Sequence, residues 1–297
     1  MKRIMTISLL ALMAAAFIAC EQTDVPTEDE IPESDIPVIP ADPSEGSTDF
    51  KHRMLLIQHT GTACGYCPEM ISCLSELSEL PEYNDAYNLV AVHAYNPDDK
   101  AYTDDAVLIE SEFGVGGFPA LTFNLTTRNA PQRLANIKQT VDEHRKEKAD
   151  IGIAAASKVT DGKVVVRVEV KGAVENVYRI SVWLLQDNIY AKQKDYNTGV
   201  FEDWMNYHNN CLMKMAGNGN HTKVYGRNIG TVAAGTKIAG NYSIAVDKAW
   251  DLDKCKLLIL ANGQIVDVDN PKDVDYDVSN SVICPINGSV AYDYISE

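Results

Sequence analysis

The chain is poor in basic residues. Its 26 Lys and Arg stand against 42 Asp and Glu, for a formal net charge of −16. Proteins that bind nucleic acid use clustered Lys and Arg to neutralise phosphates, so this acidic balance argues against nucleic acid as a partner. Residues 21–49 contain no Lys or Arg at all, which also disfavours direct attraction to anionic lipid.

Several motifs are missing as well. The sequence has no phosphate-binding glycine loop, no serine-hydrolase motif and no internal repeat, so we expect no cofactor. It also lacks an apolar run of about 20 residues, the length that a membrane-spanning helix needs. The longest candidate, from Ile4 to Ala19, is shorter and follows Lys2 and Arg3, which is typical of an export signal.

The end of that apolar run carries a second signal. Residues 17–20 read Phe-Ile-Ala-Cys and resemble a bacterial lipobox, whose cysteine is acylated and becomes the first residue after cleavage. We expect residues 1–19 to be a lipoprotein signal peptide and Cys20 to carry the lipid, such as palmitate. The alternative is an ordinary signal peptide cleaved near Ala19.

Residues 20–50 form an acidic, proline-rich stretch. Positions 21–49 hold ten Asp or Glu and five Pro, too little apolar surface to offset the entropy of ordering. We therefore expect a disordered tether after Cys20. Together these features predict an outer membrane lipoprotein of the bacterial cell envelope, either periplasmic or surface-exposed.

Residues 51–149 alternate strand and helix patterns, as an α/β domain requires. Residues 54–59, 89–95 and 120–123 are expected strands. Residues 67–80, 103–113 and 131–148 are expected helices, the second capped by Thr103 or Asp104.

The sequence Cys64-Gly65-Tyr66-Cys67-Pro68 lies between the first strand and the first helix. In this context a C-x-x-C motif predicts a thioredoxin-like redox pair. A thiol at a helix N-terminus has a lowered pKa, so Cys64 is the expected exposed nucleophile. Cys67 is then the covered thiol that resolves a mixed disulfide. The alternative is a permanently oxidised structural clip.

A second match lies at residues 113–123, Phe-Gly-Val-Gly-Gly-Phe-Pro-Ala-Leu-Thr-Phe. This stretch resembles the thioredoxin segment that carries a cis-proline before a strand, with Pro119 in the proline position. The resemblance implies that Pro119 faces the cysteine pair and shapes an edge for a disulfide-bearing peptide.

The whole arrangement resembles the twenty-eight-kilodalton outer-membrane antigen family, which joins a lipoprotein signal, a thioredoxin-like domain with a T-G-x-x-C-G-Y-C-P stretch, and a β-rich domain. Here that stretch is residues 60–68. Three positions depart from thioredoxins. Ala63 replaces Trp, Gly-Tyr replaces Gly-Pro between the cysteines, and Gln58 replaces the buried acid that assists proton transfer. His59 is the candidate substitute for that acid.

Residues 150–297 change to short β-type runs, which predict an all-β sandwich of immunoglobulin-like type that folds separately. The expected strands are residues 151–157, 163–170, 178–185, 242–246, 256–260 and 281–284, with a hairpin at Asp161-Gly162. Residues 195–228 are expected to form a long loop.

The remaining cysteines and acidic residues suggest no metal site. Cys73 lies about 240° around the helix from Cys67, which disfavours a shared zinc or an intrahelical disulfide. A Cys255–Cys284 disulfide is plausible, with the pairing left open. The His208–Cys211 stretch has no acid or base partner beside it in sequence, so we expect a packed loop. The five Asp residues between 267 and 277 lack the spacing of an EF-hand, although calcium binding stays an alternative.

Two functions are therefore expected from the sequence. The first is a lipid-anchored thiol-disulfide oxidoreductase or isomerase that acts on protein thiols or disulfides of the envelope. The second is a surface-exposed binding or adhesion lipoprotein that uses the thioredoxin fold as a scaffold. The fold is common to both.

Overall fold

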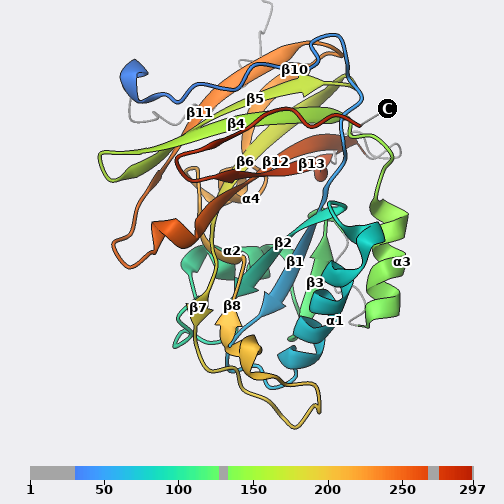
Figure 1. Ribbon diagram of the computed structural model, residues 1–297, viewed down its shortest axis with the longest axis vertical. Helices are drawn as coiled ribbons and strands as arrows, with labels where there is room; N and C mark the ends of the chain where they lie inside the picture. Colours follow the sequence, from blue (N-terminus) through green and yellow to red (C-terminus); the bar gives the residue numbers. More distant parts are fainter. Residues whose placement is uncertain (1–30, 127–132, 267–273, 296–297) are drawn as a thin grey trace, which may run out of the picture. The chain divides into compact units, whose positions relative to one another are not determined.

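Hydrophobic runs along the chain form two main sheets, which the computed structural model describes over residues 31–126, 133–266 and 274–295 (Figure 1). The larger sheet has eight strands in the order β13-β12-β6-β9-β2-β1-β3, with β10 pairing β6 beside this path. Its strands are β1 Met54–Thr60, β2 Tyr87–His93, β3 Ala120–Phe123, β6 Asn176–Gln186, β9 Cys211–Met215, β10 Arg227–Val232, β12 Cys255–Val266 and β13 Val274–Pro285.

The second sheet has four strands in the order β11-β5-β4-β14. Its strands are β4 Ile151–Thr160, β5 Lys163–Gly172, β11 Lys237–Ala245 and β14 Ser289–Val290. A short antiparallel pair joins β7 Ile189–Tyr190 to β8 Tyr207–His208. The predicted hairpin at Asp161-Gly162 is confirmed, because both residues have positive φ and connect antiparallel β4 and β5.

The helices among the described residues are α1 Cys67–Glu79, α2 Asp104–Phe113, α3 Leu134–His144 and α4 Asn220–Val224, with 3₁₀ turns at Glu33–Asp35, Pro81–Tyr83, Asp203–Asn206 and Leu252–Lys254. Thr103 caps α2 as predicted, since its side chain accepts a hydrogen bond from the Ala106 N–H. Gly114 ends the helix at φ 56°, a left-handed conformation that glycine adopts without strain.

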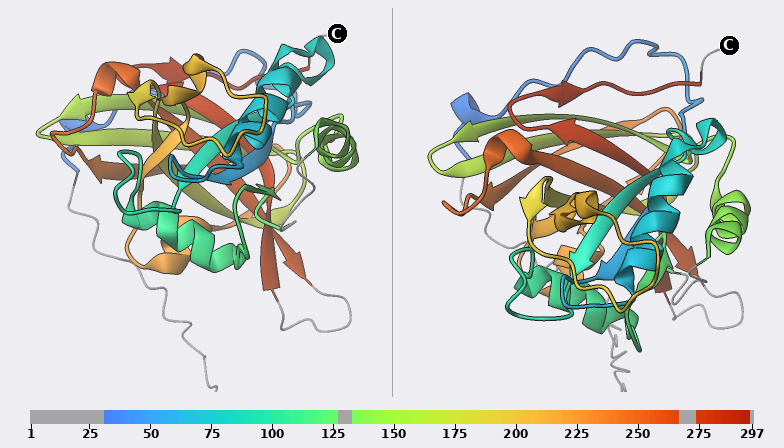
Figure 2. Two further views of the ribbon diagram at one scale, coloured as in Figure 1. Left: turned by 90° about the horizontal axis from the view of Figure 1, so that it is seen from below. Right: turned by 60° about the horizontal axis from the view of Figure 1, so that its bottom comes forward.

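Helices cover both faces of the sheet around β1, β2 and β3 (Figures 1 and 2). Met54 and Leu56 of β1 pack with Met70 of α1 and Ile137 of α3 on one face. Leu55 and Ile57, the alternate residues, pack on the other face with a cluster that includes Ile109 and Phe113 of α2. Because successive strand residues point to opposite faces, one fully buried strand holds both layers together.

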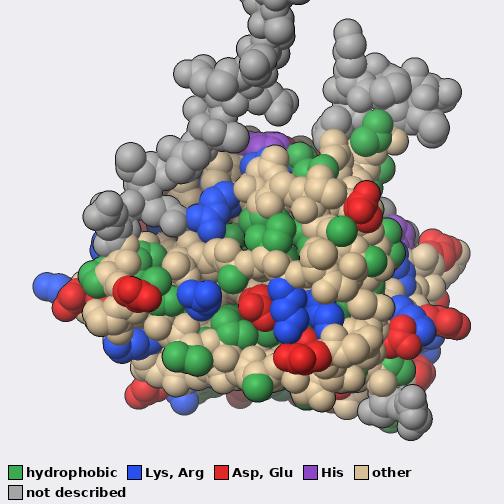
Figure 3. Space-filling view, turned by 90° about the horizontal axis from the view of Figure 1, so that it is seen from above, with side chains coloured by type: hydrophobic (Ala, Val, Ile, Leu, Met, Phe, Trp, Pro, Cys, Tyr) green, Lys and Arg blue, Asp and Glu red, His purple; other side chains and the backbone are tan. Residues whose placement is uncertain are grey.

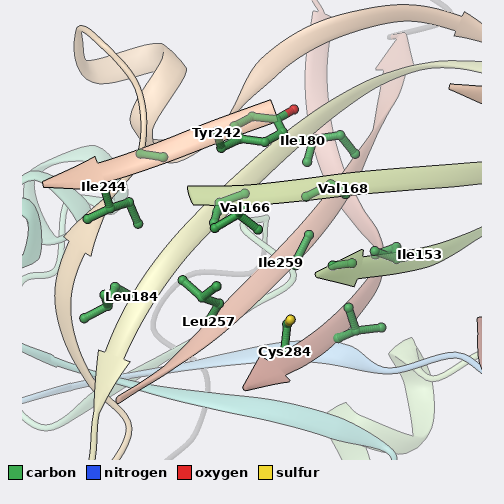
Figure 4. Close-up of a cluster of buried hydrophobic side chains, with 14 of the residues drawn as sticks. Ile153, Val166, Val168, Ile180, Leu184, Tyr242, Ile244, Leu257, Ile259 and Cys284 are labelled. Carbon is green, nitrogen blue, oxygen red and sulfur yellow. The ribbon is translucent and has the colours of Figure 1, made fainter. Parts of the chain in front are cut away.

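The two sheets enclose a separate hydrophobic core (Figure 4). Ile153 of β4 and Val166 of β5 contribute from the smaller sheet, and Leu184 of β6 and Leu257 of β12 contribute from the larger one. The six strands predicted after residue 150 all lie in these sheets. Two sheets packed face to face agree with a sandwich, whereas an immunoglobulin-like strand order stays a prediction.

The larger sheet runs through both parts of the chain, which corrects the expectation of two separately folded domains at 51–149 and 150–297. Strand β9 pairs with β2 at Ala91 and Cys211 and pairs with β6 on its other side. Strand β9 thus occupies the edge of β2 at Ala91, whose N–H donates to the Asn210 carbonyl. The predicted loop at 195–228 is therefore partly structured, since it contains β8, β9 and α4.

Residues 31–49 lie against the second sheet, which corrects the prediction of a disordered tether for that portion of residues 20–50. Lys171 is 1% exposed, and its Nζ lies 3.1 Å from an Asp42 carboxylate oxygen. Lys237 and the Tyr294 hydroxyl also donate to Asp42. Burial alone would raise the pKa of Asp42, but these hydrogen bonds and that from the Ser44 N–H hold it well below its usual range. An acidic residue of the expected tether thus pairs with a buried lysine.

The face that carries these contacts is mixed in charge. Seen from above, Lys and Arg side chains are interspersed with Asp and Glu (Figure 3). Some of these oppositely charged side chains form ion pairs, such as Lys158–Asp35 and Lys237–Glu169.

Candidate functional site

The cysteine pair lies where the sequence predicts, between the end of β1 and the start of α1. Cys64 and Cys67 form a disulfide, and Cys67 is the first residue of α1. The turn is held by hydrogen bonds from the Cys64 N–H to the Gly61 carbonyl and from the Cys67 N–H to the Cys64 carbonyl. Within the described part of the chain no side chain caps this helix N-terminus, so its partial positive charge is available to a thiolate in the reduced pair.

A segment from the distant half of the chain covers this turn. We call residues 191–196 the strap. The Lys194 N–H donates to the Thr62 carbonyl at 2.7 Å, and the Tyr196 N–H donates to the Gly65 carbonyl at 2.9 Å. In Figure 2 the yellow segment runs past the start of α1. Cys64 is only 3% exposed, which corrects the expectation of an exposed nucleophile, whereas Cys67 is buried as predicted.

Side chains of the strap complete the cover. Gln193 is buried, and its Nε2 donates to the Cys64 carbonyl at 2.9 Å. The Tyr196 ring lies over Gly65 and meets the Tyr66 ring edge to face, with centroids 5.1 Å apart. A Cβ at Gly65 would lie 2.4 Å from that ring, so this position requires glycine in the covered state.

The strap is fixed at its other end by the short β7–β8 pair and its neighbours. The Gln193 N–H donates to Asn206 Oδ1, and the Ala191 N–H donates to the Asn206 carbonyl. His208 Nε2 bonds the Ala191 carbonyl at 3.0 Å. Burial, together with nearby His93, lowers the pKa of His208 to about 4, so its ring is neutral at pH 7.

The Phe118–Pro119 peptide bond is cis, as the sequence predicts. The Phe118 ring meets Tyr95 edge to face at 5.2 Å. Tyr95 in turn lies against Gly61, where an added Cβ would come within 2.6 Å of the Tyr95 Cβ. Gly61, Tyr95 and Phe118 therefore connect the cysteine turn to the proline segment.

Gln58 and His59 point to opposite faces of β1 and neither supplies a buried acid. His59 Nε2 bonds the Thr122 hydroxyl at 2.9 Å, and burial lowers the pKa of His59 to about 4. Gln58 is buried on the face that packs against α1, with no change of charge available to it. The proton transfer that a buried carboxyl performs in thioredoxins has no equivalent at position 58.

A family profile matches the part of the chain that contains most of α2, the strap and most of the β-rich half. This profile, described as Outer membrane protein Omp28, covers residues 106–274, more than half of the chain. The chain belongs to the Omp28 family. This membership confirms both the resemblance to the twenty-eight-kilodalton antigens and the predicted localisation in the outer membrane of the bacterial envelope. None of the described helices is long and apolar enough to cross a membrane.

A solved structure shows a related fold. HBP35 of Porphyromonas gingivalis superposes with a TM-score of 0.61 at 13% identity, over 84% of this chain and 80% of that chain. Protein AGR_C_4864 from Agrobacterium tumefaciens gives 0.49 at 10% identity, over 82% and 99%. A domain of the outer membrane lipoprotein Omp28 from Porphyromonas gingivalis gives 0.28 at 19% identity, over 47% and 89%. A comparison with curated proteins finds no match.

Sequence reasoning missed one polar chain in this Omp28 family member. Asp99 Oδ2 bonds His93 Nδ1 at 2.8 Å, and His93 Nε2 lies 3.7 Å from Cys211 Sγ. Asp99 also accepts the Thr62 N–H of the cysteine turn at 2.7 Å. The sequence places no acid or base beside residues 208–211, but the fold brings His93 and Asp99 to Cys211. His93 and Asp99 lie more than 100 residues away, where no periodicity could indicate them.

The Asp99–His93–Cys211 chain has a structural role in the protein with the Cys64–Cys67 disulfide formed. Cys211 is fully buried, and burial raises the pKa of its thiol well above the usual value. Through the contact between Cys211 Sγ and His93 Nε2, the chain joins β2 and β9 to the turn below Cys64. It thus positions the cysteine turn.

The other described cysteines are thiols outside the disulfide. Cys284 lies opposite Leu257, two residues beyond Cys255, so the strand register does not support the Cys255–Cys284 disulfide. Burial raises the pKa of Cys255 to about 12 and of Cys284 to about 11. Cys73 is partly buried.

Two predicted sites lie outside the described residues. They are Cys20, the lipidation site, and the acidic residues within 267–273. Within the described ranges, no group of three or more His, Cys, Asp or Glu side chains is arranged to hold a metal ion.

Proposed function

We propose that this protein is an envelope thiol-disulfide oxidoreductase or isomerase, built on a thioredoxin-like arrangement of β1–β3 and α1–α3. The observation that carries the proposal is the Cys64–Cys67 disulfide at the junction of a buried strand and a helix N-terminus. The cis Phe118–Pro119 bond in the predicted segment adds a second, independent feature. Both features lie in the order along the chain that thioredoxins have.

The roles of the two cysteines follow from their positions. In the oxidised protein, a client thiolate attacks Cys64 Sγ, the Sγ–Sγ bond breaks, and Cys67 leaves as a thiolate. A second client thiol then displaces Cys64, which releases a client disulfide and the reduced pair. In the reduced protein, the Cys64 thiolate attacks a client disulfide and Cys67 resolves the adduct. Pro119 shapes the edge that binds the client.

The strap controls access in this proposal. The N–H groups of Lys194 and Tyr196 bond the Thr62 and Gly65 carbonyls on either side of Cys64, and Cys64 is only 3% exposed beneath the strap. The strap must therefore move before Cys64 reacts. A gate of this kind restricts exchange to clients that bind well enough to displace it.

The expected clients are protein thiols or disulfides of the envelope, with Cys20 as the lipid anchor that holds the protein at the membrane. The neutral Gln58 favours disulfide transfer or isomerisation over general reduction, because a neutral amide at this position cannot assist deprotonation of Cys67.

An assay with the full chain tests the proposal. It should unscramble ribonuclease or reduce insulin, and Cys64→Ser should abolish that activity. Cys67→Ser should retain client proteins as mixed disulfides, since the resolving attack is lost. Cys73→Ser is the matched control, because Cys73 lies outside the disulfide on the same helix and its replacement should leave both results unchanged.

The burial of Cys64 favours a second candidate, a binding or adhesion lipoprotein in which the disulfide is a structural clip. This candidate predicts no catalysis and no trapped clients, even after the strap is weakened. It also predicts a lower melting temperature for Cys64→Ser combined with Cys67→Ser, whereas an oxidoreductase tolerates the reduced state.

A further inference from the structure

A small pocket opens behind the cysteine turn, on the face of the larger sheet that packs against α1. It has a volume of about 220 Å³ and lies between β1, β2, α1 and residues 204–210. Cys64 and Cys67 are not among its lining residues, so a ligand in this pocket would bind independently of the proposed redox function.

Two polar side chains on β1 line this pocket without a protein partner. Gln58 is 6% exposed and Thr60 is 2% exposed. Within the described part of the chain, Gln58 Nε2 and Thr60 Oγ1 have no hydrogen-bond partner. A buried amide or hydroxyl that lacks a partner costs about 1–3 kcal/mol. Each such group in a folded protein requires an explanation, and a bound ligand that supplies the missing bond is one.

The rest of the lining mixes apolar side chains with the polar residues Ser75, Ser78, His93, His208, Asn209 and Asn210. Ile71 and Leu74 of α1 and Leu89 of β2 form the walls, and the half-exposed rings of Trp204 and Tyr207 lie at the rim. Among the described residues, no Lys or Arg lines the pocket.

The charged side chain behind the wall of the pocket is the carboxylate of Asp99. Asp99 lies behind the lining residue His93, and its pKa is held well below the usual range, because hydrogen bonds from His93, Thr62 and Ala101 outweigh the effect of burial. His208, also in the lining, is neutral at pH 7. Because the described lining offers no positive charge, the pocket disfavours an anionic ligand and favours a neutral ligand.

The volume limits the size of that ligand. A cavity of roughly 150 Å³ holds a benzene ring, whereas pockets for drug-sized ligands begin at roughly 300 Å³. A space of about 220 Å³ therefore suits a molecule with one ring and a short polar group.

We infer that this pocket is a binding site for a small neutral molecule with one apolar ring and one hydrogen-bond acceptor, such as a carbonyl oxygen. Gln58 Nε2 donates to the acceptor, the Thr60 hydroxyl supplies a second bond, and the ring packs against Ile71, Leu74 and Leu89. Trp204 and Tyr207 close the rim over the ring.

Benzamide is the probe for a titration by calorimetry with the full chain carrying Cys20→Ser, which avoids detergent. We expect one saturable site with a Kd at or below about 1 mM. Benzoate, the anion of the same shape, should bind at least about tenfold more weakly. Cys64→Ser combined with Cys67→Ser should bind benzamide as the parent chain does, which separates this site from the redox proposal.

Gln58→Leu provides the decisive variant. It should weaken benzamide binding about tenfold or more, because the donor is lost. It should also raise the melting temperature of the ligand-free chain, since an unpaired buried amide is removed. Gln139→Leu, on the exposed part of α3, is the matched control and should leave benzamide binding unchanged.

Three results would overturn the inference. Benzamide could fail to saturate, or it could bind Gln58→Leu as tightly as the parent chain. A lower melting temperature for ligand-free Gln58→Leu would show that water alone satisfies the amide. Thr60→Val gives an independent check, since it should weaken benzamide binding without loss of the fold.

Discussion

The side-chain amide of Gln193 donates a hydrogen bond of 2.9 Å to the carbonyl oxygen of Cys64, although 129 residues separate them. The same Nε2 lies 3.4 Å from the Gly61 carbonyl. Gln193 therefore ties the strap to both ends of the turn that precedes α1. Because it is buried, this bond is protected from competition with water.

Gln193→Leu should loosen the strap and speed reduction of the Cys64–Cys67 disulfide. The loss of a buried hydrogen bond costs about 1–2 kcal/mol, which corresponds to a roughly five- to thirtyfold larger open population. The rate of reduction by dithiothreitol, followed by alkylation and mass spectrometry, measures this change. Gln139→Leu serves as the exposed control, and an unchanged rate in Gln193→Leu would show that the strap does not limit access.

Gly65→Ala should open the strap by a different route, because the added Cβ meets the Tyr196 ring at 2.4 Å. We expect a loss of about 1–3 kcal/mol in the free energy of unfolding. In a Tyr196→Ala background the same substitution should cost much less, since the clash is gone. A double-mutant cycle by chemical denaturation measures the coupling, and strictly additive effects would contradict the contact.

The local features of this fold could be predicted from sequence. The turn at Cys64–Cys67, the cis bond before Pro119 and the cap at Thr103 depend on residues close together in the chain. Each is specified by short-range chemistry, such as a helix N-terminus or a capping hydroxyl. Such patterns are visible without tertiary structure.

The long-range features could not be predicted. Strand β9 joins the sheet beside β2, and Asp42 pairs with Lys171, across more than 100 residues in each case. The strap, Ala-Lys-Gln-Lys-Asp-Tyr at residues 191–196, shows no strand or helix period. It is fixed by the carbonyl oxygens of Thr62 and Gly65, whose availability no sequence pattern reveals.

Stability should fall as the pH drops from about 6.5 to 4. Burial lowers the pKa values of His52, His59 and His208 to about 4 in the folded chain, while an unfolded histidine titrates near 6.5. The unfolded state therefore binds protons first, so the stability present above pH 6.5 is lost toward pH 4.

His59→Gln should flatten this dependence by about 1.4 kcal/mol per pH unit, one group's share, because glutamine does not titrate. Urea denaturation at pH 7, 6 and 5 measures it. The exposed control Gln139→Leu removes no titratable group and should leave the slope unchanged. An equal slope in His59→Gln would mean that His59 titrates normally.

Cys20→Ser should release the protein from membranes, because the predicted lipid is the anchor and the adjacent acidic stretch gives no attraction to anionic lipid. Fractionation followed by a wash at high salt measures this. Cys73→Ser should stay in the membrane fraction, and a Cys20→Ser protein that still sediments there would show that another contact anchors it.

Asp99→Asn should destabilise the fold and loosen the cysteine turn together. Asp99 accepts three hydrogen bonds, from the Thr62 N–H at 2.7 Å, the Ala101 N–H at 2.9 Å and His93 Nδ1 at 2.8 Å. An asparagine presents an NH₂ group to at least one of these donors, so one buried donor is left unpaired. We expect a cost of about 2–4 kcal/mol.

The rate of disulfide reduction distinguishes loosening of the cysteine turn from a general loss of stability in Asp99→Asn. Because Thr62 also holds the strap through the Lys194 N–H, Asp99→Asn should accelerate reduction of the Cys64–Cys67 disulfide. Asp98→Asn is the matched control, since Asp98 is exposed and should change neither quantity. A variant Asp99→Asn that loses stability but keeps the parent reduction rate in the folded state would show that the Asp99–His93–Cys211 chain supports the sheet without positioning the cysteine turn.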